Sequence, residues 1–520
     1  MLDTLKRAGQ SLLTRLINLD VQHGKPIHDL TPRQTIVPIT VVSIVFMMWG
    51  VAYGLLDIMN YHIRLEMNLG RGQAALLAAG YYLVYLPGAI YIGGNLVRRL
   101  GYRVTMVYGL IMLAVGDIFM SIAAQHRDFA GMVASHFVVG LGVSALERAA
   151  NPYATNCGPR IFAPLRLLVA QALAGVGTVI APFLANALIF NPATSMDIPP
   201  LDVSHPGRCI KIPETDAGDL TTVVTFYRGL AGGIFGLAFV MAVVFFRTQL
   251  VPEVGQETSP KTDCRWKLWK HPLVSMRYSR LWWGVAANFF NLGCQVAFAQ
   301  FFIEHMAVSA CASNKWAANY MAIAQGVFVV GRFTAAAAVS KPRIFRPRWV
   351  LAFFIAGAVA MTGAGTAVTG KLAVGLACMV MFFEAPSFPM IFESATAGFE
   401  AWTPTAETLM IGSICGGGVL PALMGQLVEA TYITTGWWLV TGCFVLVFTY
   451  CLATCMIPSY RQRLDAAEFG NSQAGSRSDS EDGLRQKVLR DPGVELVENP
   501  LAKTPSARKY FGGAGGHGSS

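Results

Sequence analysis

Residues 130–155 read AGMVASHFVVGLGVSALERAANPYAT, and this stretch decides the fold class. It is long enough to cross the hydrocarbon core of a bilayer, which takes about 20 residues of α-helix. A charged side chain at that depth is costly, and it usually faces a partner or a water-filled cavity. Glu147 and Arg148 are such residues. The stretch therefore predicts a membrane helix that carries part of a functional site.

The whole chain has the composition of a polytopic membrane protein. Of its 520 residues, 54% are hydrophobic and 13% are charged, whereas soluble domains carry roughly 25% charged residues. The net charge is +10. The basic residues collect in short loops between apolar runs, which is a topology signal and argues against nucleic acid as a partner. The ten cysteines form no C-x-x-C pair or His/Cys cluster, so we expect no metal, no cofactor and no disulfide framework.

Twelve apolar runs are long enough to span a bilayer. They lie at about 36–60, 73–96, 104–124, 130–155, 164–190 and 221–246, and then at 281–306, 315–338, 349–369, 372–395, 404–429 and 436–457. The predicted fold class is an all-α polytopic membrane protein, with twelve transmembrane helices arranged as two six-helix pseudo-repeats. The expected organisation is a cytoplasmic N-terminal segment (1–35), a first bundle (36–247), a cytoplasmic central loop (248–280), a second bundle (281–457) and a cytoplasmic, largely disordered tail (458–520).

The two sets of six runs resemble each other. Tyr82 and Gly88 of the second run recur at the same displacement as Tyr320 and Gly326 of the eighth. The tetrapeptide Trp-Gly-Val-Ala at 49–52 recurs at 283–286. Internal duplication of this kind is a recurring plan of transporters, whose substrate site lies between the repeats near the middle of the bilayer.

Loop charges predict the orientation. With an even number of spans, both termini lie on the same side of the membrane. The loops on that side hold most of the lysines and arginines, for example Arg98, Arg99 and those of the central loop. Positive loops face the cytoplasm. Both termini are therefore predicted to be cytoplasmic, in a protein expected at the plasma membrane.

The first bundle carries two candidate proton-binding acids. Glu147 and Asn151 are four residues apart and share a helix face. Asp57 closes the first run and shares a face with Tyr53 and Trp49. Apolar surroundings disfavour a charged carboxylate, so such acids can bind and release a proton. The alternative role for each is an ion pair that locks helices together, and the candidate partners of Glu147 are then Arg148 and Arg166.

Amide side chains in both bundles are candidate substrate ligands. Asn288, Asn291 and Gln295 fall on one face of the seventh run, with Gln171, Asn319 and Gln325 as weaker candidates. Amides both donate and accept hydrogen bonds, which suits hydroxyl-bearing ligands. The alternative is that they join helices to one another. Arg332 is interpreted as a structural anchor, and Asp117 has no predicted role.

Several motifs resemble the fucose-proton symporter family of the major facilitator superfamily. They are WGVAYGLLD (49–57), LERAANPYATNCGP (146–159), RLLVAQ (166–171), NLGCQ (291–295), FPMIF (388–392) and GGGVLPALMG (416–425). The resemblance covers about 36–457, and the long tails resemble those of fungal members. It implies proton coupling by Asp57 and Glu147 and a sugar contact for Gln171.

The chain departs from that family where substrate is recognised. Tyr53 and Gly54 stand where the bacterial fucose symporter has two asparagines, and Arg148 stands where it has a neutral residue. Glu384 and Glu393 are additional acids in the tenth run. Sugar specificity therefore does not transfer with the resemblance.

We expect a proton-coupled secondary transporter and not an enzyme. Its partners are a small-molecule substrate, protons and the lipid bilayer, and we expect a monomer that imports a monosaccharide or similar small polar solute. The alternatives are a proton-driven exporter of a small organic or secondary metabolite and a non-transporting sugar sensor. The substrate residues proposed from the sequence are Trp49, Tyr53, Asn151, Gln171, Asn288, Asn291, Gln295 and Asn319.

Overall fold

The computed structural model describes residues 30–67, 69–188, 220–247, 251–252, 279–309, 314–368, 370–399, 403–431 and 433–469. These residues are helical almost throughout and include no strand. The all-α fold class is therefore confirmed. Most of the N-terminal segment, the central loop and the tail lie outside the described residues, so the predictions made for them stay predictions.

The first bundle is built from long helices joined or extended by shorter ones. They are α2 (Ile36–Glu66), α3 (Arg71–Leu83), α4 (Tyr85–Pro87), the π-helix η2 (Gly88–Gly93), α5 (Gly94–Gln125), α6 (Phe129–Asn156), the 3-10 helix η3 (Arg160–Phe162), α7 (Ala163–Leu188) and α8 (Thr221–Arg247). Length and hydropathy mark eleven spanning stretches among the described residues, and one of them, Gly72–Gln125, has 54 residues. Such a stretch is far longer than the ~30 Å hydrocarbon core at ~1.5 Å per residue.

This long stretch contains two membrane spans. The backbone leaves the helical conformation at Gly101, where φ is 83°. That region of φ favours glycine because a side chain would collide with the backbone. The chain therefore turns at Gly101 between the second and third spans, and the total is twelve, as predicted.

The second bundle repeats this plan with two interrupted spans. Its helices are α11 (Ser279–Ser309), α12 (Asn314–Val339), α13 (Pro347–Ala367), α14 (Lys371–Glu384), α15 (Ser387–Thr396), α16 (Thr403–Gly412), η5 (Ser413–Cys415), α17 (Gly416–Ala430) and α18 (Ile433–Met456), followed by α19 (Pro458–Phe469). The tenth span breaks between α14 and α15 at Pro386, which has no N–H to continue the helix. The tail, predicted to be largely disordered, starts with α19 in its described part.

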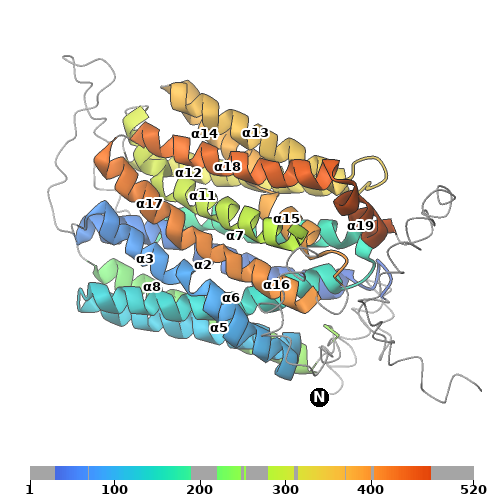
Figure 1. Ribbon diagram of the computed structural model, residues 1–520. Helices are drawn as coiled ribbons and strands as arrows, with labels where there is room; N and C mark the ends of the chain where they lie inside the picture. Colours follow the sequence, from blue (N-terminus) through green and yellow to red (C-terminus); the bar gives the residue numbers. More distant parts are fainter. Residues whose placement is uncertain are drawn as a thin grey trace, which may run out of the picture. The chain divides into compact units, whose positions relative to one another are not determined.

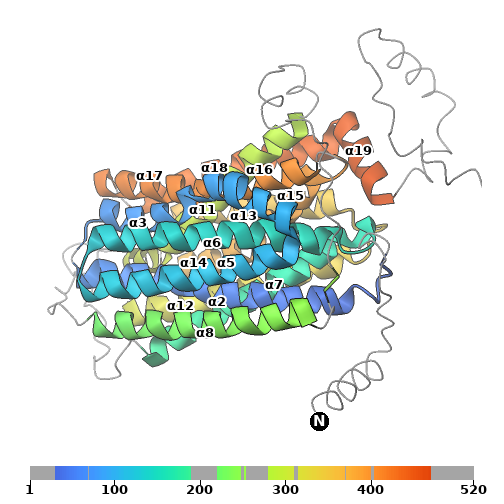
Figure 2. The ribbon, with the colours of Figure 1, turned by 90° about the horizontal axis from the view of Figure 1, so that it is seen from below.

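The two bundles meet along several helix pairs. Within the first bundle α5 packs between α6 and α8, and α2 packs on α7 (Figures 1 and 2). Between the bundles α3 packs on α17, α7 on α12 and α6 on α16. Small residues permit close approach: a side chain at Gly50 would overlap the backbone of Ala174 on α7.

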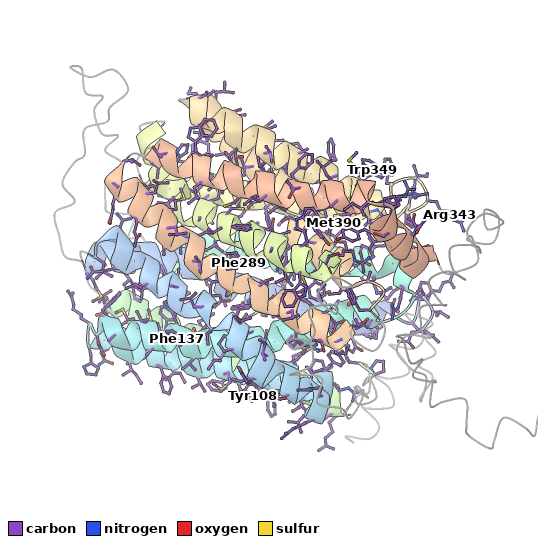
Figure 3. The ribbon with its side chains drawn as sticks, viewed as in Figure 1. Tyr108, Phe137, Phe289, Arg343, Trp349 and Met390 are labelled. Atoms are coloured by element: carbon purple, nitrogen blue, oxygen red, sulfur yellow. The ribbon has the colours of Figure 1, made fainter. Side chains whose placement is uncertain are left out.

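Large apolar side chains cover the outer surface of the helices. Phe239 is 72% exposed and Phe353 is 64% exposed. Phe137 and Trp349 also point outward from their helices (Figure 3). An apolar surface of this extent is stable only against lipid. The protein is therefore an integral membrane protein.

Candidate functional site

A cavity lies between the two bundles. It has an empty volume of about 700 Å³ and is walled by α2, α3, α4, α6 and α7 of the first bundle and by α11, α12, α14, α15 and η5 of the second. Its polar lining residues are Glu147, Gln171, Thr178, Gln295, Gln325, Arg332 and Glu384, and its aromatic ones are Trp49, Tyr53, Tyr82, Tyr85, Phe328 and Phe388. We call it the central cavity.

Glu147 is held in the wall of the central cavity by two donors. The Tyr85 hydroxyl donates to one carboxyl oxygen at 3.0 Å, and the Asn151 amide donates to the other at 3.2 Å. The Gln171 amide in turn donates to the carbonyl oxygen of Asn151 at 2.8 Å. The polar face predicted on this helix is therefore a hydrogen-bonded chain that runs from α4 through α6 to α7.

Local backbone features bring Tyr85 to Glu147. Tyr85 begins α4, the short helix directly before the π-helix η2, a rare element that is often found at functional sites. A side chain at Gly88 would overlap that of Ser144, so only glycine lets η2 approach α6 so closely. The Tyr85 hydroxyl of the second span therefore reaches the Glu147 carboxylate of the fourth span.

Arg148 points away from Glu147 and joins the two bundles. Its guanidinium donates to the Thr408 hydroxyl at 2.8 Å and to the Pro404 carbonyl at 3.1 Å, and it lies 3.5 Å from a carboxyl oxygen of Glu407. The Asn156 amide donates to the other oxygen of Glu407 at 3.0 Å. Adjacent residues on a helix point in different directions, so Arg148 and Glu147 serve different partners.

Arg166, the other candidate partner of Glu147, binds backbone instead. It donates to the carbonyl oxygens of Ala154 at 3.0 Å, Thr155 at 2.6 Å and Pro159 at 2.8 Å. It therefore caps the end of α6. The alternative in which Glu147 forms an ion pair with Arg148 or Arg166 is wrong, because both guanidinium groups are engaged elsewhere.

Arg332 is the cation of the central cavity. It donates to the carbonyl of Ala385 at 3.0 Å and to that of Gln171, and it stacks 4.4 Å from the centre of the Phe328 ring. Pro386 interrupts the helix at this point, and Arg332 satisfies a backbone oxygen at the break. Arg332 is thus an anchor, as interpreted from the sequence, and it also lines the cavity within electrostatic range of Glu147 and Glu384.

The opposite wall of the central cavity adds further polar groups. Glu384 is fully buried at the end of α14, and Gln295 is its neighbour on α11. The Thr178 hydroxyl donates to the Gln325 side chain at 2.9 Å and so joins α7 to α12 across the cavity. The site thus contains two acids and one cation, surrounded by amides and aromatic rings.

The structure separates the predicted substrate residues into two groups. Trp49, Tyr53, Gln171 and Gln295 line the central cavity. Asn151 is buried behind Glu147 and reaches the cavity through it.

The remaining predicted residues lie elsewhere. The Asn288 amide donates to the Ser413 hydroxyl at 2.8 Å and to the Met410 carbonyl at 3.2 Å, so it joins α11 to the eleventh span. Asn291 is buried and makes no side-chain hydrogen bond with the described residues. Asn319 is exposed near the start of α12 and is absent from the cavity lining. The Asp57 side chain lies outside the described residues, although its backbone belongs to α2.

Sequence reasoning left out several lining residues. Tyr82 and Tyr85 come from the motif YYLVY at 81–85, whose aromatic spacing is ordinary for a membrane helix. Thr178 and Phe388 carry no charge and gave no signal. Glu384 was noted as an added acid, and it could have been placed in the site because a buried carboxylate in a span usually faces a cavity.

Comparisons with known proteins agree with this architecture. The sequence profile described as Major Facilitator Superfamily matches residues 39–406. A glucose/galactose transporter of Brucella abortus biovar 1 (strain 9-941) is 27% identical over 435 residues, which cover 82% of this chain and 97% of that protein. The L-fucose-proton symporter of Escherichia coli (strain K12) is 25% identical over 427 residues, which cover 80% and 93%.

A solved structure shares the fold. A crystal structure of FucP, a major facilitator superfamily transporter, in the outward conformation superposes with a TM-score of 0.63 at 23% identity. The match covers 81% of this chain and 99% of that one.

Proposed function

Because this chain belongs to the Major Facilitator Superfamily, we propose that it carries a monosaccharide or similar small polar solute across the membrane together with a proton. The chain is a transporter and not an enzyme. The observation that carries the proposal is the central cavity between the bundles, with the buried Glu147 held in its wall by Tyr85 and Asn151. Relatives described as a glucose/galactose transporter and an L-fucose-proton symporter support the same substrate class.

The lining of the cavity suits a sugar. Trp49 and Tyr53 pack with their ring centres 5.6 Å apart and offer an apolar surface to the C–H face of a ring. Gln171, Gln295 and Gln325 provide amides for hydroxyl groups. The proposed contact residues are therefore these five, with Gln325 added to the predicted set. Asn151, whose amide is bonded to Glu147 and Gln171, is left out together with Asn288, Asn291 and Asn319.

Glu147 is the proposed coupling acid of the described residues. The Asn151 amide and the Tyr85 hydroxyl favour its charged form, whereas burial favours the neutral one. A carboxyl group balanced in this way can load a proton on one side of the membrane and lose it on the other. The resemblance to the fucose symporters supports the same role for Asp57.

Contacts between the bundles would be made and broken in each transport cycle. The Arg148–Glu407 pair joins α6 to α16 at the end of the bundle that loop charges assign to the cytoplasm. We propose that this contact closes the cavity on that side. We further propose that the protein works as a monomer in the plasma membrane with both termini in the cytoplasm.

One observation favours export of an organic metabolite as a second candidate. The wall from the second bundle includes the apolar side chains of Leu292, Ala299, Phe328, Met381 and Phe388 beside its polar groups. An apolar wall binds an aromatic or aliphatic solute better than a sugar. Proton-driven efflux of such a solute, without uptake of any hexose, would establish this candidate.

The test is uptake of labelled hexoses by proteoliposomes under an imposed pH gradient. Wild-type protein should concentrate at least one hexose, and removal of the gradient should abolish concentration. Glu147→Gln should abolish concentrative uptake and keep exchange of internal for external substrate, because exchange needs no net proton movement. Asn319→Ala, outside the cavity, is the matched control and should behave as wild type. Concentrative uptake by Glu147→Gln would contradict the role of Glu147.

A further inference from the structure

A second cavity lies entirely within the first bundle. It has an empty volume of about 420 Å³ and is walled by α2, α3, α5, α6 and α8. Its polar side chains include Asp117 of α5, His136 of α6 and Tyr227 of α8. Trp49 and Tyr53 line this cavity on one side and the central cavity on the other. The second cavity is therefore a neighbour of the transport site, separated from it by aromatic side chains.

Three polar side chains of this cavity are buried without a hydrogen bond to the described residues. Asp117 is 3% exposed, His136 is 1% exposed and Tyr227 is 4% exposed. An oxygen of Asp117, both ring nitrogens of His136 and the Tyr227 hydroxyl make no hydrogen bond with the described residues. Burial of polar atoms without hydrogen bonds is costly, and buried water commonly provides the missing ones. These groups therefore point to a hydrated site.

The charges around the site favour a proton. The titratable groups that face it are Asp117, His136, Tyr227, Tyr81 of α3 and Tyr53 of α2, and its lining as described contains no lysine or arginine. Arg228, next to Tyr227, donates to Gln125 at 2.7 Å and is exposed. The only basic side chain beside Asp117 in this lining as described is therefore the His136 imidazole. A bound proton is the simplest neutralising charge.

A chain of hydroxyl groups leads from this cavity to Glu147. Tyr81 lines the second cavity, and its hydroxyl lies 3.3 Å from that of Tyr85. The Tyr85 hydroxyl donates to Glu147 at 3.0 Å. Trp49 donates to the Tyr81 hydroxyl at 3.5 Å, which holds the phenol between the two cavities.

We propose that Asp117 and His136 form a proton-binding site that supplies Glu147 through Tyr81 and Tyr85. The inference rests on the proposed proton coupling at Glu147 and adds the route by which the proton arrives. The residues that form the entry site are absent from the central cavity lining. They therefore act on coupling and not on substrate binding.

The transfer moves one proton and no electrons. Glu147 takes the hydroxyl proton of Tyr85, Tyr85 takes that of Tyr81, and Tyr81 takes one from a water held between Asp117 and His136. At each step one bond to hydrogen breaks and one forms, so both phenols end neutral. Asp117 or His136 then gives its stored proton to the water. Rotation of the two hydroxyls restores the starting arrangement.

The location of the site fits entry from the outside. Asp117 and His136 lie toward the ends of α5 and α6 that join at residues 126–128. Arg148 lies toward the opposite end of α6, where it pairs with Glu407 of the second bundle. The orientation predicted by loop charges puts the 126–128 turn outside. The proposed proton site therefore lies nearer the side that loop charges assign to the outside.

The first test uses Tyr81→Phe, which removes one hydroxyl and preserves the ring. Concentrative hexose uptake driven by a pH gradient should fall about tenfold or more, since a positioned proton carrier is lost. Exchange of internal for external substrate should stay unchanged. Tyr108→Phe on α5 is the matched control and should keep both activities. A wild-type uptake rate for Tyr81→Phe, or an equal fall in uptake and exchange, would overturn the proposal.

A second measurement separates failure of this proposal from failure of the proposed function. Infrared difference spectra across a pH titration should contain a protonated-carboxyl band that disappears in Asp117→Asn and shifts in His136→Gln. This band requires no substrate, so it would be seen even if the protein transported no hexose. If the protonated-carboxyl band stayed unchanged in Asp117→Asn, the proposed proton-binding site would be refuted. Sodium-dependent uptake that is lost in Asp117→Asn would also refute it and would assign the cavity to a metal cation.

Discussion

The two ends of the interface between the bundles are joined by different kinds of ion pair. Arg148 and Glu407 are 3.5 Å apart with side chains that are each 1% exposed. Arg64 and Glu304, at the opposite end, are 3.6 Å apart with side chains 25% and 18% exposed. Removal of one partner from a buried pair strands a charge, whereas an exposed pair contributes little. Similar distances therefore describe contacts of very different strength.

The neighbours of each pair increase the contrast. Thr408 and Asn156 add hydrogen bonds to the buried pair. At the opposite end, the further bond between the bundles from the Gly72 amide to Glu429 is exposed and 3.3 Å long. The end predicted to face outside should therefore open at lower cost than the end predicted to face the cytoplasm.

Glu407→Gln should have the largest effect. It leaves the Arg148 guanidinium buried without its counter-charge, which typically costs about 3–5 kcal/mol. We expect a lower free energy of unfolding and a shift toward conformations open at this end. Thermal unfolding in detergent and accessibility of cysteines placed near Thr408 measure the two effects.

A double variant controls for the stranded charge. Arg148→Met combined with Glu407→Met removes both charges and should recover much of the stability that either single change loses. If the single and double variants lost equal free energy of unfolding, the ion pair would not be what joins the two bundles at this end.

The thiol of Cys157 reports on the same end. Burial raises its pKa to about 11, although the nearby Arg166 acts in the opposite direction. The thiolate is the reactive form, so near neutral pH the thiol should react about 100-fold more slowly than an ordinary one. Alkylation should speed up as the pH rises toward that pKa.

Mass spectrometry of the peptide that contains Cys157 gives the rate of alkylation. Denatured protein supplies the reference rate, and Glu407→Gln should move the folded protein toward it. A folded wild-type rate equal to the denatured one near neutral pH would contradict the burial of this end.

Thr178→Val tests the middle of the interface. It removes the hydrogen bond to Gln325 between the bundles and should lower the free energy of unfolding by about 0.5–1.5 kcal/mol. Thr362→Val is the matched control, because Thr362 is buried and bonds only to carbonyls of its own helix. The same loss in both variants would show that the bond between the bundles adds nothing.

Arg64→Gln should have the smallest effect. It should lower the free energy of unfolding by at most about 1 kcal/mol, since the Arg64–Glu304 pair is partly exposed. High salt should reduce the difference from wild type further. A loss as large as that of Glu407→Gln would remove the distinction between the two ends.

The predictable part of the site consists of residues related by helical periodicity. Glu147 and Asn151 share a face in any α-helix, so their contact follows from spacing alone. The contact from Tyr85 does not follow, because it depends on the π-helix after it and on how closely the second span approaches the fourth. Asn288 and Gln295 were assigned to one face, yet only Gln295 lines the cavity, since the packing of the eleventh span decides where each amide points.

The sequence by itself determined the membrane location, the twelve spans and the duplicated bundles, because the bilayer imposes length and hydropathy on every helix. It also indicated that Glu147 belongs to a functional site, because a charged side chain inside a membrane span usually faces a partner or a water-filled cavity. Only the tertiary structure decided that Arg148 pairs with Glu407 and not with Glu147, and that Tyr81 joins two cavities. These contacts connect residues distant in the chain, and they depend on how the helices pack.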